Sequence, residues 1–203
     1  MEVIPRLIQL DENIFFFINS LPHNFALEKF FLFFSFYPLI IWFLLGILLI
    51  LLKKKKDISF IFRLSLALVL AGIIASGVIK PIVKRPRPDI AFGSKVILVQ
   101  EKAAGIPANN DFAFPSGHAA IAFAGAYVLL QENNKTRKTG IEKEHKKRQI
   151  KYIIFTFAFL TAFSRIYLGK HYPLDVVAGA IVGWVTGMIS IKTSNKLFVR
   201  KNK

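Results

Sequence analysis

Three short stretches of the sequence contain side chains that bind phosphate or transfer protons. They are KPIVKRPRP with Lys80 and Arg87, FPSGH with Ser116, Gly117 and His118, and SRIYLGKHYPLD with Arg165, His171 and Asp175. Lysine and arginine pair strongly with a phosphate group. A Pro-Ser-Gly stretch at a helix start also offers backbone amides to an anion. Together these groups predict a site for phosphoryl chemistry.

In this hypothesis the two histidines divide the work. An Asp that fixes the tautomer of one imidazole makes its other ring nitrogen a better base or nucleophile. The second imidazole then protonates the leaving oxygen. The residues themselves leave open whether His118 or His171 is the nucleophile. Two His and one Asp could bind a metal, but three neighbouring cations would repel it, so we expect no metal and no other cofactor.

Each of these residues has a plainer interpretation when it is taken alone. Ser116 is more often a helix N-cap than a catalytic group. A Lys or Arg near a membrane span usually anchors the span to lipid headgroups, and we assign Lys84 and Arg85 to that role. The prediction of a site therefore depends on helices that bring all of the groups to one face.

The composition indicates that those helices lie in a membrane. Of 203 residues 54% are hydrophobic and 21 are Phe, more apolar surface than a soluble domain of this length usually carries. The net charge is +16, but the basic residues cluster between long apolar runs. That pattern favours anionic lipid headgroups over nucleic acid as the partner. The absence of cysteine excludes a disulfide and a thiolate nucleophile.

Five apolar runs are long enough to cross a bilayer as helices. They cover residues 30–52, 58–79, 112–130, 152–168 and 174–191. Arg63, near the start of the second run, is expected to extend to the headgroups. Gly179, Gly183 and Gly187 in the fifth run have a spacing that lets helices pack closely in lipid. We predict an all-α fold, an integral-membrane bundle of about five transmembrane helices that forms one domain over residues 1–203.

The N-terminal segment, residues 1–28, precedes the first run. Apolar residues at helical spacing predict an amphipathic helix over residues 4–21 that lies in the membrane interface. A short sixth span is the alternative for this segment.

The distribution of Lys and Arg predicts the orientation, because basic connections stay in the cytoplasm. Residues 53–57, 131–151 and 192–203 hold four, eight and five of them, whereas the 80–111 loop and the 164–173 turn hold six and two. We therefore place the first three segments in the cytoplasm and the last two outside. The helix ends with the phosphate-binding side chains then all meet the outer face of the membrane.

At these positions the sequence resembles the type 2 phosphatidic acid phosphatase (PAP2) superfamily. Its signature reads Lys-x6-Arg-Pro, Pro-Ser-Gly-His and Ser-Arg-x5-His-x3-Asp, and the chain fits every spacing from Lys80 to Asp175. The resemblance covers roughly residues 58–190. It implies the helical core that these phosphatases share with haloperoxidases, and a metal-independent lipid phosphatase activity.

The resemblance also implies a role for each residue. His171 would attack phosphorus and form a phosphohistidine, Asp175 would orient His171, and His118 would protonate the leaving oxygen. The phosphoryl oxygens would be held by Lys80, Arg87, Ser116, Gly117 and Arg165.

The substrates implied by the resemblance are phosphates of envelope lipids. They include undecaprenyl pyrophosphate, phosphatidylglycerol phosphate, phosphatidate and lipid A 1-phosphate, hydrolysed at the outward, periplasmic face of a bacterial cytoplasmic membrane. A vanadate-dependent haloperoxidase and a non-catalytic lipid binder or transporter are the alternatives on the same core. The five apolar runs argue against the first, and the intact His118, His171 and Asp175 argue against the second.

Overall fold

The structure, a computed structural model, describes residues 3–36, 40–42, 44, 47, 58–99, 112–135 and 141–199. Every regular element in these ranges is helical, which confirms the all-α class. The longer helices are α1 (Val3–Asn19), α2 (Phe25–Phe36), α4 (Ile58–Gly72), α7 (Gly117–Lys135), α8 (Ile141–Tyr167) and α9 (Pro173–Val199). The shorter ones, between α4 and α7, are the π-helix η1 (Ile73–Ile79), α5 (Lys80–Val83), α6 (Pro88–Phe92) and the 3-10 helix η2 (Gly93–Lys95).

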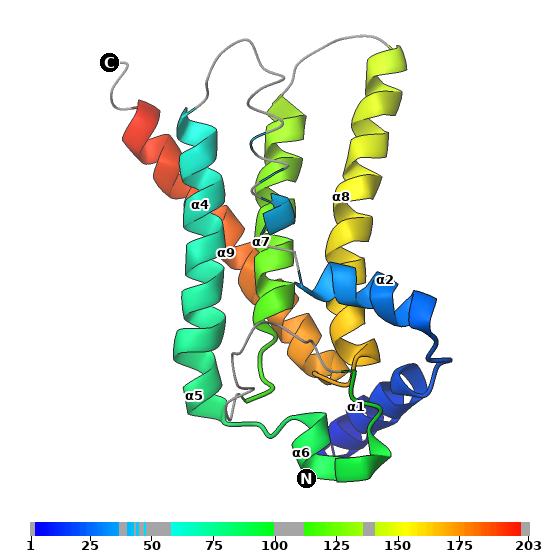
Figure 1. The fold of residues 1–203 in the computed structure, drawn as a ribbon. Helices are drawn as coiled ribbons and strands as arrows, with labels where there is room; N and C mark the ends of the chain where they lie inside the picture. The colour runs from blue at the N-terminus through cyan, green and yellow to red at the C-terminus, as the bar shows by residue number, and fades with distance from the viewer. Residues whose placement is uncertain are drawn as a thin grey trace.

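The central helix of the bundle is α7, which packs against α4, α8 and α9. Figure 1 shows α4, α7 and α8 side by side, with α9 crossing obliquely behind them and α1 and α2 lying across the lower end. The side chains of Ala120, Ala122, Ala124 and Ala126 on α7 are fully buried. Such small side chains allow neighbouring helix backbones to approach closely.

Three helical stretches are long and apolar enough to cross a membrane. They are Ile58–Lys95, Arg148–Tyr167 and Pro173–Phe198, and they correspond to the predicted second, fourth and fifth spans. The predicted third span coincides with α7, whose last turn has the polar sequence QENN. Because α7 is surrounded by other helices, it needs less apolar surface than a lipid-facing helix. Of the predicted first span, 30–52, residues 30–36 belong to α2, and residues 37–39, 43, 45–46 and 48–52 lie outside the described residues.

The helix predicted over residues 4–21 is present as α1. Four of the six apolar side chains on which that prediction rests are exposed, namely Leu7, Leu10, Ile14 and Phe17. The other two, Ile18 and Leu21, are half-buried and pack against the core. The opposite face is buried and carries Asp11, Phe15 and Asn19, spaced four residues apart. Thus α1 turns a partly polar face toward the protein and an apolar face outward, as suits a helix at a membrane interface.

The glycine spacing of α9 brings this helix against the α7 backbone. A Cβ atom at Gly183 would lie 2.1 Å from the Ala120 carbonyl oxygen, and one at Gly179 would lie 2.3 Å from the Ser116 carbonyl oxygen. Neither position has room for a side chain, which confirms the predicted close packing. The contact at Gly179 also fixes the first turns of α9 beside the start of α7.

A buried ion pair joins three helices at the other end of the bundle. Arg63 of α4 lies 3.3 Å from the Glu132 carboxylate of α7 and donates to the Ser194 hydroxyl of α9 at 3.0 Å. Arg63 is only 8% exposed, so the prediction that it extends to the headgroups is wrong. A buried guanidinium is stable only beside a counter-charge and acceptors, which Glu132 and Ser194 supply.

We expect Gly183→Ala to destabilise the protein, because the new methyl group would overlap the Ala120 carbonyl oxygen. The loss should be on the order of 1–3 kcal/mol, seen as a lower midpoint of thermal unfolding in detergent. Gly72→Ala is the matched control, since a Cβ there meets nothing within 4 Å and alanine stabilises a helix relative to glycine. Equal midpoints for Gly183→Ala and the parent protein would contradict the packing.

Candidate active site

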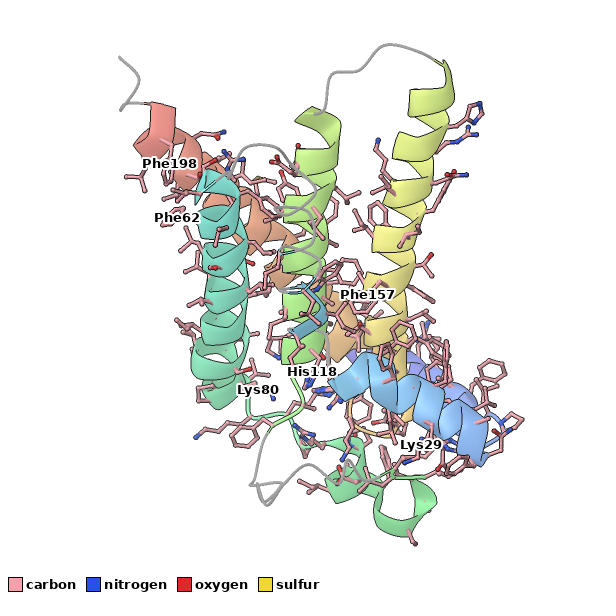
Figure 2. All side chains as sticks on the ribbon, turned by 45° about the horizontal axis from the view of Figure 1, so that its top comes forward. Lys29, Phe62, Lys80, His118, Phe157 and Phe198 are labelled. Carbon is pink, nitrogen blue, oxygen red and sulfur yellow. The ribbon has the colours of Figure 1, made fainter. Side chains whose placement is uncertain are left out.

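The predicted site residues gather at one end of the bundle. Lys80 begins α5 and His118 stands in the first turn of α7. Figure 2 shows both at the same end of the molecule, away from Phe62 and Phe198 at the other end. Arg87 directly precedes α6, and Ser116 and Gly117 lie at the start of α7. Arg165 lies in the last turn of α8, His171 in the turn that follows, and Asp175 in the first turn of α9. The sequence prediction that these helix ends share one face is therefore confirmed.

The end of α8 positions His171 by a Schellman motif. The Gly169 amide donates to the Ile166 carbonyl at 3.0 Å and the Lys170 amide donates to the Arg165 carbonyl at 3.0 Å, the two bonds that define this helix ending. Gly169 has a φ of +76°, and a Cβ there would lie 2.7 Å from the Ile97 carbonyl oxygen. The His171 amide also donates to the Arg165 carbonyl, at 3.1 Å. This hydrogen-bonded turn therefore explains why five residues separate Arg165 from His171.

The start of α9 positions Asp175 by a capping interaction. Pro173 is the first residue of the helix, and the Asp175 carboxylate accepts the Tyr172 amide at 2.9 Å through Oδ2. This is the backward half of a capping box, in which the third helical residue binds the N-cap amide. The same Oδ2 lies 3.6 Å from Nδ1 of His171, and both side chains are almost fully buried. This cap therefore explains why three residues separate His171 from Asp175.

A backbone hydrogen bond joins the start of α7 to Asp175. The Ser116 amide donates to the Asp175 carbonyl at 2.8 Å. The Ser116 hydroxyl lies 3.4 Å from the Ala119 amide, the arrangement of an N-cap serine. Gly117 is closely covered, because a Cβ there would lie 2.7 Å from the Ser76 hydroxyl. The first turn of α7, with its backbone amides, therefore begins beside Asp175.

Three cations surround His171. The positive charges of Arg165, Arg87 and Lys80 all act on its imidazole. Lys80 is only 5% exposed and directly follows the π-helix η1. A π-helical turn contains more residues than an α-helical turn, so it rotates the residues that follow it relative to α4. Arg165 is also buried, and its guanidinium donates to the Ser35 hydroxyl of α2.

Burial lowers the pKa of His171 well below its ordinary value, and the charges of Arg165, Arg87 and Lys80 lower it further. A backbone hydrogen bond with Ala113 acts in the opposite direction but is the smaller effect. His171 is therefore a neutral imidazole at neutral pH. A neutral imidazole has a free lone pair, as a nucleophile requires.

Arg85 has a role that the sequence interpretation missed. Its guanidinium donates to Oδ1 of Asp175 at 2.8 Å and to Oδ2 of Asp11 at 2.6 Å. The assignment of Arg85 as a lipid anchor is therefore wrong, because a guanidinium between two buried carboxylates is held inside the protein. Its place two residues before Arg87 in an extended segment was the available signal, since such residues share a side. The Lys84 side chain is exposed, and its role as a lipid anchor stays a prediction.

The fold and the site define the class of the protein, a helical membrane bundle with cations, two histidines and a buried aspartate at one end. The chain belongs to the PAP2 superfamily, which it matches over residues 60–198. With three stretches that can span a bilayer, it is a multi-pass integral membrane protein.

Several relatives and solved structures resemble the chain. A lipid A 4'-phosphatase of Bacteroides thetaiotaomicron is 31% identical over 161 residues, which are 76% of this chain and 64% of that protein. The undecaprenyl-diphosphatase BcrC of Bacillus subtilis is 29% identical over 128 residues, 63% of this chain and 55% of that protein. This chain thus spans less than two thirds of both relatives. The crystal structure of Aquifex aeolicus LpxE matches with a TM-score of 0.66 at 31% identity, over 90% of this chain and 95% of that one.

We expect the acid limb of kcat/KM for phosphate release to lie below the ordinary histidine pKa of about 6.5, because His171 loses activity only when it gains a proton. Arg87→Gln removes one of the cations that lower the pKa of His171. The limb should therefore move to higher pH, in addition to any loss of rate. Lys84→Gln removes the same charge from an exposed position and should leave the limb in place. A limb that does not move in Arg87→Gln would contradict this electrostatic coupling.

Proposed function

We propose that the protein is a membrane phosphatase that hydrolyses a lipid phosphate or pyrophosphate through a phosphohistidine on His171. The observation that supports this most directly is the buried imidazole of His171, whose Nδ1 lies 3.6 Å from the Asp175 carboxylate while the charges of Arg165, Arg87 and Lys80 act on the ring. The cations would bind the phosphoryl group, and the carboxylate would stabilise the positive imidazole ring that forms after attack.

In the first step, Nε2 of His171 attacks phosphorus while Nδ1 faces Asp175. A P–N bond forms and the bond from phosphorus to the leaving oxygen breaks. His118 gives its proton to that oxygen. Lys80, Arg87 and Arg165, with the Ser116 hydroxyl and the Gly117 amide, hold the three remaining phosphoryl oxygens.

In the second step, water attacks the phosphohistidine. His118, now neutral, takes a proton from the water, a P–O bond forms and the P–N bond breaks. Inorganic phosphate leaves and His171 returns to the neutral form. The two steps use His118 first as an acid and then as a base, as microscopic reversibility requires.

The substrate we favour is an envelope lipid with a pyrophosphate or a sugar phosphate. Two relatives support this choice, since one is named a lipid A 4'-phosphatase and another an undecaprenyl-diphosphatase. Phosphatidylglycerol phosphate and phosphatidate carry the same reacting group and belong in the same comparison. In this proposal the residues assigned to phosphate binding hold only the phosphoryl group, so other residues select the lipid.

We expect purified protein in detergent to release inorganic phosphate from such lipids, and to do so in excess EDTA, because side-chain cations supply the positive charge. His171→Ala should lose at least about a thousandfold in kcat, as expected for loss of a nucleophile. His145→Ala, which changes an exposed histidine of α8, should keep full activity. Phosphate release by His171→Ala at the parent rate would rule out the phosphohistidine.

The site faces the periplasm or cell exterior in this proposal, because the basic connections 53–57, 131–151 and 192–203 belong in the cytoplasm. The chain has no cysteine, so one added cysteine gives an unambiguous label. We expect Ser94→Cys, exposed in η2, to react with a membrane-impermeant maleimide in intact spheroplasts. His145→Cys, exposed near the other end of α8, should react only after permeabilisation. The reverse labelling would show that the site faces the cytoplasm.

A further inference from the structure

An unbroken chain of ionic contacts runs from the N-terminal helix to Asp175. Oδ2 of Asp11 in α1 lies 2.6 Å from one terminal nitrogen of Arg85, and the other terminal nitrogen lies 2.8 Å from Oδ1 of Asp175. The guanidinium also stands over the Tyr172 ring, with its carbon 3.8 Å from the ring centre. Asp11 and Asp175 are 2% and 0% exposed. The arrangement is therefore a bridge in which a partly exposed guanidinium joins two buried carboxylates.

The second oxygen of Asp11 holds the backbone next to Asp175. Oδ1 accepts the Leu174 amide at 2.7 Å, and Leu174 immediately precedes Asp175 in the first turn of α9. One carboxylate thus holds Asp175 in two ways, through the main chain of its neighbour and through the side chain of Arg85. Both contacts join segments far apart in the sequence, since Asp11 lies 163 residues before Leu174.

The charge of the bridge bears on the chemistry at His171. A guanidinium paired with Asp175 alone would neutralise that carboxylate. With Asp11 on its other side, the bridge keeps a net negative charge. That charge is available to the imidazole, which becomes cationic when its Nε2 bonds to phosphorus.

We propose that Asp11 is a positioning residue of the active site, acting through Arg85 to hold Asp175 in place and to keep negative charge beside His171. This proposal rests on the proposed function. Asp11 lies outside the residues that match the superfamily, 60–198. The N-terminal helix is thereby a part of the catalytic machinery and not only a contact with the membrane.

Other contacts hold α1 in place without Asp11, so its role can be tested separately. The Asn19 side chain donates to the carbonyls of Ile97 and Tyr167 at 2.9 and 3.0 Å and accepts the Ile97 amide at 2.9 Å. Phe15 is fully buried and packs against Tyr172 with ring centres 5.4 Å apart. These contacts do not involve Arg85.

The test compares steady-state kinetics of Asp11→Asn and the parent protein on the same lipid phosphate. Asparagine keeps the shape and an acceptor for the Leu174 amide but removes the charge. We expect kcat to fall about 10- to 100-fold, because a misplacement of about 1 Å can cost roughly 100-fold in rate, with KM changed less than about threefold because the phosphate-binding cations remain. Asp11→Glu, which restores the charge, should recover part of the rate. Asn19→Ala should lower the midpoint of thermal unfolding without this selective loss of kcat.

Glu12→Gln is the matched control, since it removes the same charge from the next residue, and it should keep the parent kcat. In an Arg85→Gln background, Asp11→Asn should cause no further loss, because the two residues act as one unit. If Asp11→Asn does not fold, Arg85→Lys tests the same bridge, because lysine keeps the charge but cannot span two carboxylates. It should then show the same selective fall in kcat.

A parent-like kcat in Asp11→Asn, an equal loss in Glu12→Gln, or an equal further loss in the Arg85→Gln background would overturn the positioning role. These results leave the proposed function intact if the parent releases phosphate and His171→Ala does not. A parent protein without activity would overturn both proposals.

Discussion

Asp175 is a buried carboxylate, and such a group is stable only where donors and opposite charge surround it. The Tyr172 amide and the Arg85 guanidinium both donate to the Asp175 side chain. The backbone carbonyl of Asp175 accepts the Ser116 amide. One residue thereby fixes the start of α9, the segment after α5 and the start of α7 relative to one another. The His171 imidazole faces a carboxylate that cannot turn away without losing these bonds. The arrangement of the site follows from this single requirement.

The bundle uses different means of holding helices together along its length. At the end with the candidate site, backbone and side-chain hydrogen bonds to Asp175 join the helix starts. From the site end toward the middle, glycines of α9 lie against the α7 backbone at Ser116 and Ala120, where the two helices associate by close packing. At the far end, Arg63 and Glu132 form a buried ion pair. The site end is thus part of a framework that is fixed at both extremes.

The sequence was informative where spacing reflects a local hydrogen-bond pattern. The intervals from Arg165 to His171 and from His171 to Asp175 correspond to a Schellman motif and a capping interaction, and apolar runs located the helices that carry them. Arg85 was assigned wrongly because its partners are set by tertiary contacts. Asp11 was not identified at all, since a lone acidic residue in an amphipathic helix has no local signal for a partner in α9. The π-helix before Lys80 was not predicted either, because a continuous apolar run does not show which helical period the backbone adopts.

The turn between α8 and α9 has a consequence for how this chain can change during evolution. Its length is set by hydrogen bonds between residues at fixed separations in the sequence, and not by the distance that a flexible connection must span. One inserted or deleted residue between Arg165 and His171 would move the imidazole off the Arg165 carbonyl and away from Asp175, even with every side chain retained. The lineage can therefore exchange side chains around this turn far more easily than it can alter its register.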